Sequence, residues 1–453
     1  KRYILVHIVG GLILLAGIII TVSQTGSIGF NLFEFSNLGT WLILIGFLIN
    51  AAATPFSSWL PDAYPQATIL GGVILSAYTT KTAVYAIIRG FSGWDILIPL
   101  GCAMAIYGII YAILENDIRR VLAFSIVNQV GFKLVGIGIG TTLAINGVIA
   151  HVFAGVIYTA LLWMTAGSVI YRTGTSKFTQ LGGLYKMMPI TTLFAIVGAL
   201  AISAFPFFSG YTTKTMIILA AEYKHMFWTW LILEIASAGA VLHAGLKYPY
   251  YTFFNKTSKI QCSEAPKSML IGMGGLSLIC FVIGCFPETL YNILPDTDVV
   301  KYKMSSNFLD IYIHHFPKTI TKLQLLLLST LAFFICRPLL KPKQITLLDF
   351  DWFYRKGGSY FYKIMDSFLN KTNELVNYYT INIFIANLAN FFRQAPAHFI
   401  NLLCKPIWYL NNIDNQEQNN RKEKIFHQCK INSFPVNVSG LCILGLLGYL
   451  ILI

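Results

Sequence analysis

Long runs of apolar residues recur along most of the chain and determine its predicted architecture. A helix needs about 20 predominantly apolar residues to cross the hydrocarbon core of a bilayer. The short alternating segments of a transmembrane barrel do not dominate the pattern. The predicted spans are residues 3–22, 39–56, 68–89, 94–114, 118–140, 142–171, 189–222 (broken), 226–246, 268–290, 321–340 and 433–453. The chain is therefore predicted to be an all-α, polytopic transmembrane helix bundle.

Two of these segments contain a proline beside small residues. Pro55 interrupts the stretch Asn50–Ser58, and Pro206 interrupts the stretch Ser203–Gly210. Proline lacks a backbone donor and breaks a helix. Broken helices at corresponding positions of two halves are typical of inverted-repeat transporters, whose ion path lies between the breaks. A pair of ordinary proline kinks is the alternative interpretation.

Residues 341–430 depart from this pattern. Aromatic and apolar residues alternate with charges up to residue 410, and a polar run follows at 411–424. This segment is too polar to span, so it is predicted to form amphipathic helices that lie on the membrane surface or laterally against partner subunits. A soluble domain is the alternative. The predicted organisation is thus a transmembrane domain at 1–340, the amphipathic segment at 341–430 and a carboxyl-terminal transmembrane helix at 433–453.

Composition agrees with a membrane protein and disfavours a nucleic-acid-binding one. The 453 residues are 56% hydrophobic and only 11% charged, whereas a soluble protein carries about a quarter charged residues. The net charge of +14 would indicate nucleic acid only if it clustered on one soluble face. Most lysines and arginines instead fall in one set of loops, which includes Lys247, and fewer, such as Lys322, fall in the opposite set. This bias predicts a cytoplasmic amino terminus.

Lys81 lies near the middle of the predicted span 68–89. An ammonium at bilayer depth costs about 2.5–3.5 kcal/mol on insertion scales, so it needs an aqueous cavity, a partner or a functional role. Tyr78 and Tyr85 lie at i−3 and i+4 and are predicted to hydrate the ammonium or to accept its hydrogen bonds. A structural lysine, paired with a neighbouring helix or snorkelling to the surface, is the alternative.

Further titratable side chains interrupt later spans. Burial disfavours the charged forms of lysine and carboxylate, and histidine titrates near neutral pH, so such groups can relay protons. The predicted proton or ion pathway comprises Lys81, Lys133, His151, Lys214, Glu234 and His243. Two alternatives stay open: Glu234 neutralises one lysine as a structural pair, and His151 is a helix-packing residue.

Other chemistry has little support in the sequence. The eight cysteines are scattered without CxxC or zinc spacing, and the spans contain no nucleophile–base or cofactor motif. We therefore expect no cofactor and no metal in this chain, and no enzymatic activity of the chain by itself.

A set of specific motifs resembles one known family. These motifs are Trp59-Leu60-Pro61-Asp62-Ala63-Tyr64, Thr80-Lys81-Thr82-Ala83-Val84-Tyr85, Glu115–Ser125 with its Asp117, Arg119 and Arg120, Leu181–Lys186, Pro206–Gly210, Leu242–Lys247 and Leu348–Arg355. Through them, residues 1–355 resemble the antiporter-like subunits shared by respiratory complex I, Mrp-type sodium/proton antiporters and membrane-bound hydrogenases, and most of all the D-type subunit of the cation/proton antiporters. The resemblance implies two inverted five-helix units with broken helices around a central polar axis that carries protons.

The resemblance also implies roles for individual residues. Lys81 aligns with the family's lysine in the helix after the first broken one. Lys214 aligns with the lysine or glutamate of the second broken helix. His151 matches the central histidine of the connecting stretch.

Three positions depart from the family pattern. Asn50 stands where the family usually carries a lysine in the first broken helix. The acidic partner of that lysine belongs to an amino-terminal helix that would lie before Lys1. Gly155 and Thr159 stand where many members carry a histidine and a lysine. Lys133 is an extra charge at a position that is more often apolar, and it is a candidate to compensate.

The functional expectation follows from these residues and from the resemblance. We expect a subunit of a multi-subunit monovalent cation/proton antiporter or of a complex I-like, NADH dehydrogenase-like proton-translocating assembly, in which any redox centres lie in other subunits. The expected partners are other membrane subunits and the lipid bilayer, with no nucleic acid, in a bacterial plasma (inner) membrane. The alternative is a degenerate scaffold subunit without an ion path of its own, which Asn50, Gly155 and Thr159 favour.

Overall fold

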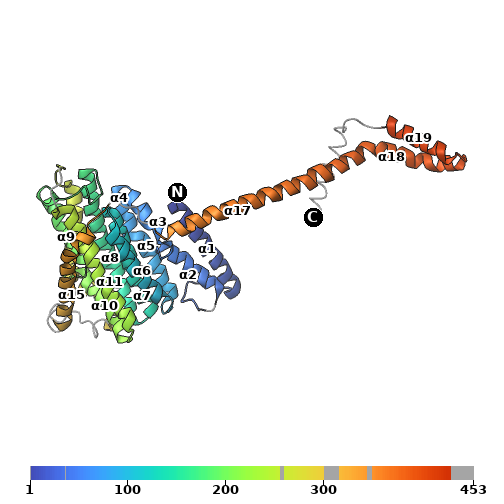
Figure 1. Cartoon of the computed structure of the whole chain (residues 1–453). Helices are drawn as coiled ribbons and strands as arrows, with labels where there is room; N and C mark the ends of the chain where they lie inside the picture. Colours follow the sequence, from blue (N-terminus) through green and yellow to red (C-terminus); the bar gives the residue numbers. More distant parts are fainter. Residues whose placement is uncertain (1, 36, 256–259, 300–315, 344–348, 430–453) are drawn as a thin grey trace. The chain divides into compact units, whose positions relative to one another are not determined.

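The computed structural model describes residues 2–35, 37–255, 260–299, 316–343 and 349–429. Within these ranges the chain is helical apart from turns and loops, and the single pair of bridged extended residues is Asp117 with Lys177 (Figure 1). The predicted all-α class is thereby confirmed. The chain divides into two compact units, Lys1–Trp352 and Phe353–Ile453, which are described separately. The predicted span 433–453 lies outside the described residues.

The first unit contains the helices that match the predicted spans. They are α1 (Arg2–Thr25), α2 (Leu38–Asn50), η1 (Phe56–Ser58), α3 (Trp59–Ala63), η2 (Tyr64–Gln66), α4 (Ile69–Ile74), η3 (Leu75–Thr79), α5 (Thr80–Phe91), α6 (Leu97–Leu114), α7 (Ile118–Ile139), α8 (Thr142–Thr173), η4 (Leu184–Lys186), α9 (Pro189–Ile202), α10 (Ser209–Tyr223), α11 (Phe227–Ala240), η5 (Val241–Lys247), η6 (Tyr250–Phe254), α12 (Lys267–Cys285), α13 (Glu288–Tyr291), α15 (Phe316–Ile335) and α16 (Arg337–Leu340).

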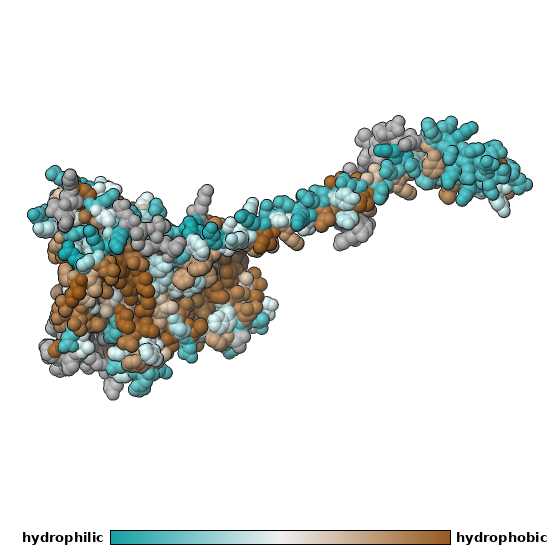
Figure 2. Space-filling model, viewed as in Figure 1, coloured by the Kyte–Doolittle hydropathy of each residue, from teal (hydrophilic) through white to brown (hydrophobic). Residues whose placement is uncertain are grey.

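Many of these helices have the length and composition of membrane spans. Among the described residues, six helical stretches suffice to cross a bilayer, namely α1, α6, α7, α8, the continuous stretch Phe227–Phe254 and α12. Shorter apolar helices are α2, α9 and most of α15. Figure 2 shows a band of apolar side chains across the visible face of the first unit, with polar residues gathered above and below it. Exposed leucines such as Leu12, Leu70 and Leu278 contribute to this apolar surface, as lipid contact requires. The chain is an integral membrane protein.

Helix α7 lies at the centre of the first unit. All but one of its 22 residues are buried, polar ones included, and it packs closely against α6 and α8. Glycine permits the closest approach: a Cβ on Gly131 would lie 2.6 Å from the backbone oxygen of Gly101 on α6. Small residues at such crossings let helix backbones pack directly in a membrane protein.

Both predicted helix breaks are present. Helix α2 ends at Asn50, and the chain turns through Ala52, whose φ is 58°, before the cis Thr54–Pro55 bond and η1. The second break lies between α9 and α10, where Ala204 and Phe207 have φ values of 57° and 71°. The indole Nε1 of Trp59 donates to the Ile49 carbonyl over 3.0 Å and stabilises the first break.

Two further irregularities go beyond the sequence prediction. Helices α4 and α5 are joined by the π-helical turn η3, and α11 continues into the π-helical turn η5. A π-helical turn changes the register of the side chains that follow it, and such turns occur frequently at functional sites. The first of these turns lies immediately before Thr80 and Lys81, and the second contains His243.

The second unit is also helical in its described part. A long helix runs through α17 (Asp351–Asn377), η8 (Tyr378–Ile385) and α18 (Ala386–Leu410), and α19 (Asn415–Gln428) packs back against α18. The rings of His398 and Phe426 meet edge to face with centroids 4.8 Å apart. Large apolar side chains remain exposed along α17 and α18, among them Phe361 and Leu402. The expected surface or lateral role of this segment remains a prediction.

Candidate functional site: a buried polar axis

Four of the predicted pathway residues lie buried in the centre of the first unit, each on a different helix. Lys81 comes from α5, Lys133 from α7, His151 from α8 and Lys214 from α10. Each is at most 5% exposed. The sequence predicts that these residues belong to one pathway, and the fold brings them together on packed helices. We call these four residues the buried axis.

Lys81 is held by the irregular backbone that precedes it. Its ammonium donates to the Ser76 carbonyl in the π-helical turn η3. The prediction that Tyr78 and Tyr85 contact the ammonium is wrong, because these two residues are 59% and 57% exposed while Lys81 is buried. Tyr78 lies inside the π-helical turn, which changes its register relative to Lys81. Lys81 reaches back toward the helix amino terminus, as helical side chains do, and therefore away from Tyr85.

His151 joins three helices at the middle of the axis. Its Nε2 lies 3.1 Å from Gln129 Oε1 on α7, and its Nδ1 lies 3.2 Å from Thr213 Oγ1 on α10. Gln129 Nε2 in turn donates to Asn128 Oδ1 over 2.9 Å, and the Tyr158 hydroxyl donates to Gln129 Oε1 over 3.3 Å. An imidazole with a polar partner on both nitrogens can accept a proton on one side and release it on the other. His151 is thus part of a hydrogen-bonded chain rather than a packing residue alone.

Lys133 faces the space beside Gly155. A Cβ built on Gly155 would lie 3.2 Å from Lys133 Nζ and 3.3 Å from the Tyr158 hydroxyl oxygen. The ammonium therefore occupies the volume that a side chain at position 155 would fill. Thr159, one turn further along α8, is buried as well. Lys133, the extra charge relative to the family pattern, thus lies beside Gly155. Position 155 is one of the two positions where the expected family side chains are absent.

Lys214 follows the second helix break and is hydrogen-bonded to the helix end that the break exposes. Its ammonium donates to the carbonyl of Ile202, the last residue of α9, over 2.7 Å. It also lies 5.2 Å from the ring centroid of Phe132, at the distance of a cation–π contact. The last carbonyls of a helix lack intrahelical donors, so the break supplies a partner that a continuous helix would not.

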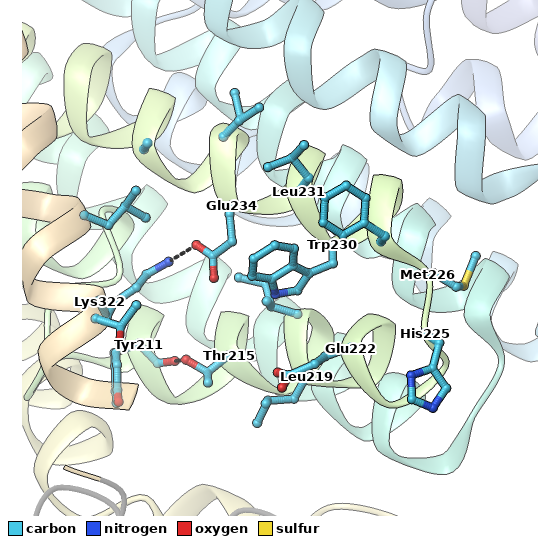
Figure 3. Close-up of a pocket in the computed structure, with 16 residues that line it drawn as sticks. Tyr211, Thr215, Leu219, Glu222, His225, Met226, Trp230, Leu231, Glu234 and Lys322 are labelled. Carbon is cyan, nitrogen blue, oxygen red and sulfur yellow. Dashed lines mark hydrogen bonds and ion pairs between the residues drawn. The ribbon is translucent and has the colours of Figure 1, made fainter. Parts of the chain in front are cut away.

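Glu234 pairs with a lysine, although not with one of the lysines on the predicted pathway. Its carboxylate accepts from Lys322 Nζ over 2.9 Å (Figure 3). The same ammonium donates to Ser237 Oγ over 2.9 Å. Lys322 counts among the predicted loop charges, at the very start of the predicted span 321–340, but it is only 8% exposed and lies on α15. Lys322 stands at the amino-terminal edge of an apolar segment. At such a position the sequence alone does not distinguish a charge in a loop from a charge that pairs with another helix.

His243 lies at the periphery of this network. Its Nδ1 lies 2.7 Å from the Gly239 carbonyl oxygen of its own helix. Within the described residues its Nε2 is buried without a hydrogen-bond partner. No hydrogen bond joins it directly to His151 or Lys214 in that part of the chain.

Lys247 also differs from its predicted place in a loop. Its side chain is 1% exposed, and its ammonium donates to the carbonyls of Ala112, Ile113 and Glu115 at 3.1, 2.6 and 2.5 Å. These carbonyls belong to the carboxyl-terminal end of α6, where the helix dipole favours a cation. Lys247 therefore serves to cap α6.

Asn50 carries a neutral amide at the position where the family pattern leads us to expect a charged lysine. Its side-chain amide donates to the Gly46 carbonyl of its own helix over 3.2 Å. The helix before the first break therefore ends in a neutral amide instead of the expected ammonium.

Charged side chains at the predicted cytoplasmic face form a separate network. Arg120 donates to Glu115 at 2.7 Å and to Asp62 at 3.1 Å, and Asp62 also accepts from Arg2 at 2.7 Å. The motifs around Asp62 and Arg120 thus meet in space and hold the first break against α7.

Comparison with known proteins places these features in a family. The family described as "NADH:quinone oxidoreductase/Mrp antiporter, TM" matches residues 1–239. An uncharacterized protein of Methanocaldococcus jannaschii is 27% identical over 319 residues, which cover 65% of this chain and 66% of that protein. A Na(+)/H(+) antiporter subunit of Alkalihalophilus pseudofirmus is 26% identical over 316 residues, covering 64% of this chain and 63% of that one.

The fold agrees with these matches. A chain of the Mrp complex from Dietzia sp. superposes with a TM-score of 0.60 at 20% identity, covering 67% of this chain and 68% of that chain. The chain spans less than two thirds of the length of the curated relatives it matches. The family match covers more than half of the chain, and the chain therefore belongs to the NADH:quinone oxidoreductase/Mrp antiporter transmembrane family.

Proposed function

We propose that this chain is a proton-translocating subunit of a multi-subunit monovalent cation/proton antiporter or of a complex I-like assembly. The observation that carries the proposal is the buried axis of Lys81, Lys133, His151 and Lys214, which crosses α5, α7, α8 and α10. Desolvated cations are costly and in membrane proteins mark ion pathways. Three lysines and a histidine buried in one bundle are more than helix packing requires.

The axis can move protons because its members interact. Lys133 lies within electrostatic range of Lys81, His151 and Lys214. Like charges at close range in a low-dielectric interior disfavour each other's charged forms. A proton that reaches one lysine therefore promotes release from the next. His151, which is hydrogen-bonded to Gln129 and Thr213, is the titratable group among them that can exchange a proton.

The expected surroundings follow from the same proposal. The relative named as a Na(+)/H(+) antiporter subunit and the Mrp structure belong to systems with several subunits, which supports partners among other membrane subunits. We assign the exposed apolar faces of α17 and α18 to the membrane surface or to such subunits. The location we propose is a bacterial plasma membrane, although relatives also occur in archaea and eukaryotes.

The test is proton flux in membrane vesicles that contain the assembled complex, followed with a pH-sensitive dye. Lys81→Ala and Lys214→Ala are each expected to lower the flux at least about tenfold. Lys177→Ala is the matched control, because Lys177 is an exposed lysine paired with Asp117 at 3.1 Å, and it should leave the flux unchanged.

The scaffold alternative makes the opposite prediction. The neutral amide of Asn50 at the first break motivates this alternative, but the antiporter relative and the Mrp structure do not favour it. A pure scaffold would keep wild-type flux in the Lys81→Ala and Lys214→Ala variants, while deletion of the chain would disassemble the complex. That pattern would overturn the proposed function.

A further inference from the structure

A cavity of about 800 Å³ lies beside α10, α11 and the start of α15 (Figure 3). The Glu234–Lys322 pair lies toward one end of its lining residues, and His225 and Met226 lie toward the other, at the connection between α10 and α11. Glu222 and His225 are exposed. The predicted topology places this connection on the extracytoplasmic side. The cavity thus extends from the connection between α10 and α11, where Glu222 and His225 are exposed, to an ion pair within the first unit.

The two members of the pair differ in their exposure. The Glu234 side chain is 25% exposed and faces the cavity, whereas the Lys322 side chain is 9% exposed and is also bonded to Ser237. A purely structural pair would place neither group beside open volume. The carboxylate is thus the more exposed member of the pair, and it is on the cavity side.

The pair also lies close to the buried axis. Lys214 is within electrostatic range of both Glu234 and Lys322. Helix α10 carries Lys214, and Tyr211 and Ile218, which line the cavity, lie three residues before it and four residues after it on the same helical face. The same helix thus contributes Lys214 to the axis and part of the lining to the cavity.

We propose that the Glu234–Lys322 pair is the site at which protons pass between buried Lys214 and water in this cavity, an inference that rests on the proposed function. The Lys214 ammonium releases a proton and becomes a neutral amine. The Glu234 carboxylate takes up that proton and becomes a neutral carboxylic acid, while Lys322 keeps its hydrogen bond to Ser237. The acid then releases the proton to cavity water as hydronium, and the restored carboxylate pairs with Lys322 again.

The first test asks whether water fills the cavity, and it does not depend on transport. In a variant without native cysteines, Leu231→Cys and Leu325→Cys each place a thiol in the lining. Only a thiolate reacts with a charged methanethiosulfonate reagent, so a thiol in hydrocarbon is protected. Both positions should react at least about tenfold faster than Leu327→Cys, which is exposed on α15 but outside the lining. Equal, slow reaction of all three would overturn the inference.

The second test separates proton exchange from a structural ion pair. Removing one partner of a buried pair destabilises a protein, but replacing both with apolar or neutral groups is often tolerated. Glu234→Gln should lower flux at least about tenfold. Adding Lys322→Met should restore thermal stability without restoring flux, and Glu234→Asp should keep part of the flux because it retains a titratable group.

The outcomes distinguish this inference from the proposed function. Wild-type flux in Glu234→Gln, or recovery of flux in the Glu234→Gln/Lys322→Met double variant, would overturn the role of the pair while the axis stands. A wild-type assembly that carries no protons would instead refute the proposed function and with it the proton step, even if the cavity cysteines react.

Discussion

The ammonium of Lys133 lies directly against the side-chain position of residue 155, because a Cβ on Gly155 would lie 3.2 Å from Lys133 Nζ. The two residues are on neighbouring helices, α7 and α8. The absence of a side chain on one therefore creates the space for the charge of the other.

This relationship predicts the effect of Gly155→Ala. The new methyl group would press on Lys133 Nζ and the Tyr158 hydroxyl, both of which are ends of flexible side chains. We expect a small loss of stability, below about 1 kcal/mol, because the lysine can shift by a few tenths of an ångström. Proton flux should fall, since the ammonium moves within the axis. Thermal unfolding in detergent and vesicle flux measure the two effects.

Gly131→Ala is the matched control for that substitution. Its Cβ would lie 2.6 Å from the Gly101 backbone oxygen, which cannot move without separating α6 from α7. It should cost about 1–3 kcal/mol or more. Equal stability of the two alanine variants would contradict this account of the Gly155 site.

Lys133→Met tests the charge itself. Methionine is long, flexible and apolar, so it fills the same volume without an ammonium. We expect the melting temperature to stay the same or rise, because a desolvated charge is removed, while flux falls at least about tenfold. Lys186→Met, at an exposed position, serves as the control and should change neither quantity. Undiminished flux in Lys133→Met would exclude Lys133 from the pathway.

Lys247→Met should lower the melting temperature, unlike Lys133→Met, which should keep or raise it. The substitution leaves the carbonyls of Ala112, Ile113 and Glu115 without their shared donor. A buried acceptor that loses its partner costs about 1–3 kcal/mol, so the melting temperature should fall clearly. Lys247→Arg keeps a donor and should recover much of the loss. A stable, inactive Lys247→Met variant would instead indicate a role in transport.

The second helix break depends on Gly210. A Cβ there would overlap the Ala201 carbonyl oxygen, so Gly210→Ala forces α9 and α10 apart. We expect a loss of stability of about 1–3 kcal/mol or more and a loss of flux, because Lys214 is bonded to the carbonyl that ends α9. Gly275→Ala meets nothing within 4 Å and should resemble the wild type in both measurements.

Some features could not be read from the sequence because they depend on contacts between distant helices. Lys247 and Lys322 stand at the ends of apolar segments and resemble loop charges, but one caps α6 and the other pairs with Glu234 on α11. Tyr78 and Tyr85 fit a regular helix around Lys81, yet the π-helical turn and the backward reach of the lysine separate them from it. Nothing in the local sequence marks that turn.

The sequence by itself determined the class of the protein, its apolar spans within the described residues, the breaks at Pro55 and Pro206 and the intramembrane positions of Lys81, Lys133, His151 and Lys214. These features follow from the solvation cost of each residue and from local backbone chemistry, which do not depend on distant partners. Only the tertiary structure decided which ammonium meets which oxygen, how Lys133 comes to lie beside Gly155, and that Glu234 faces a cavity. Those relationships depend on crossings between helices that are far apart in the chain, and they arise only when the helices pack.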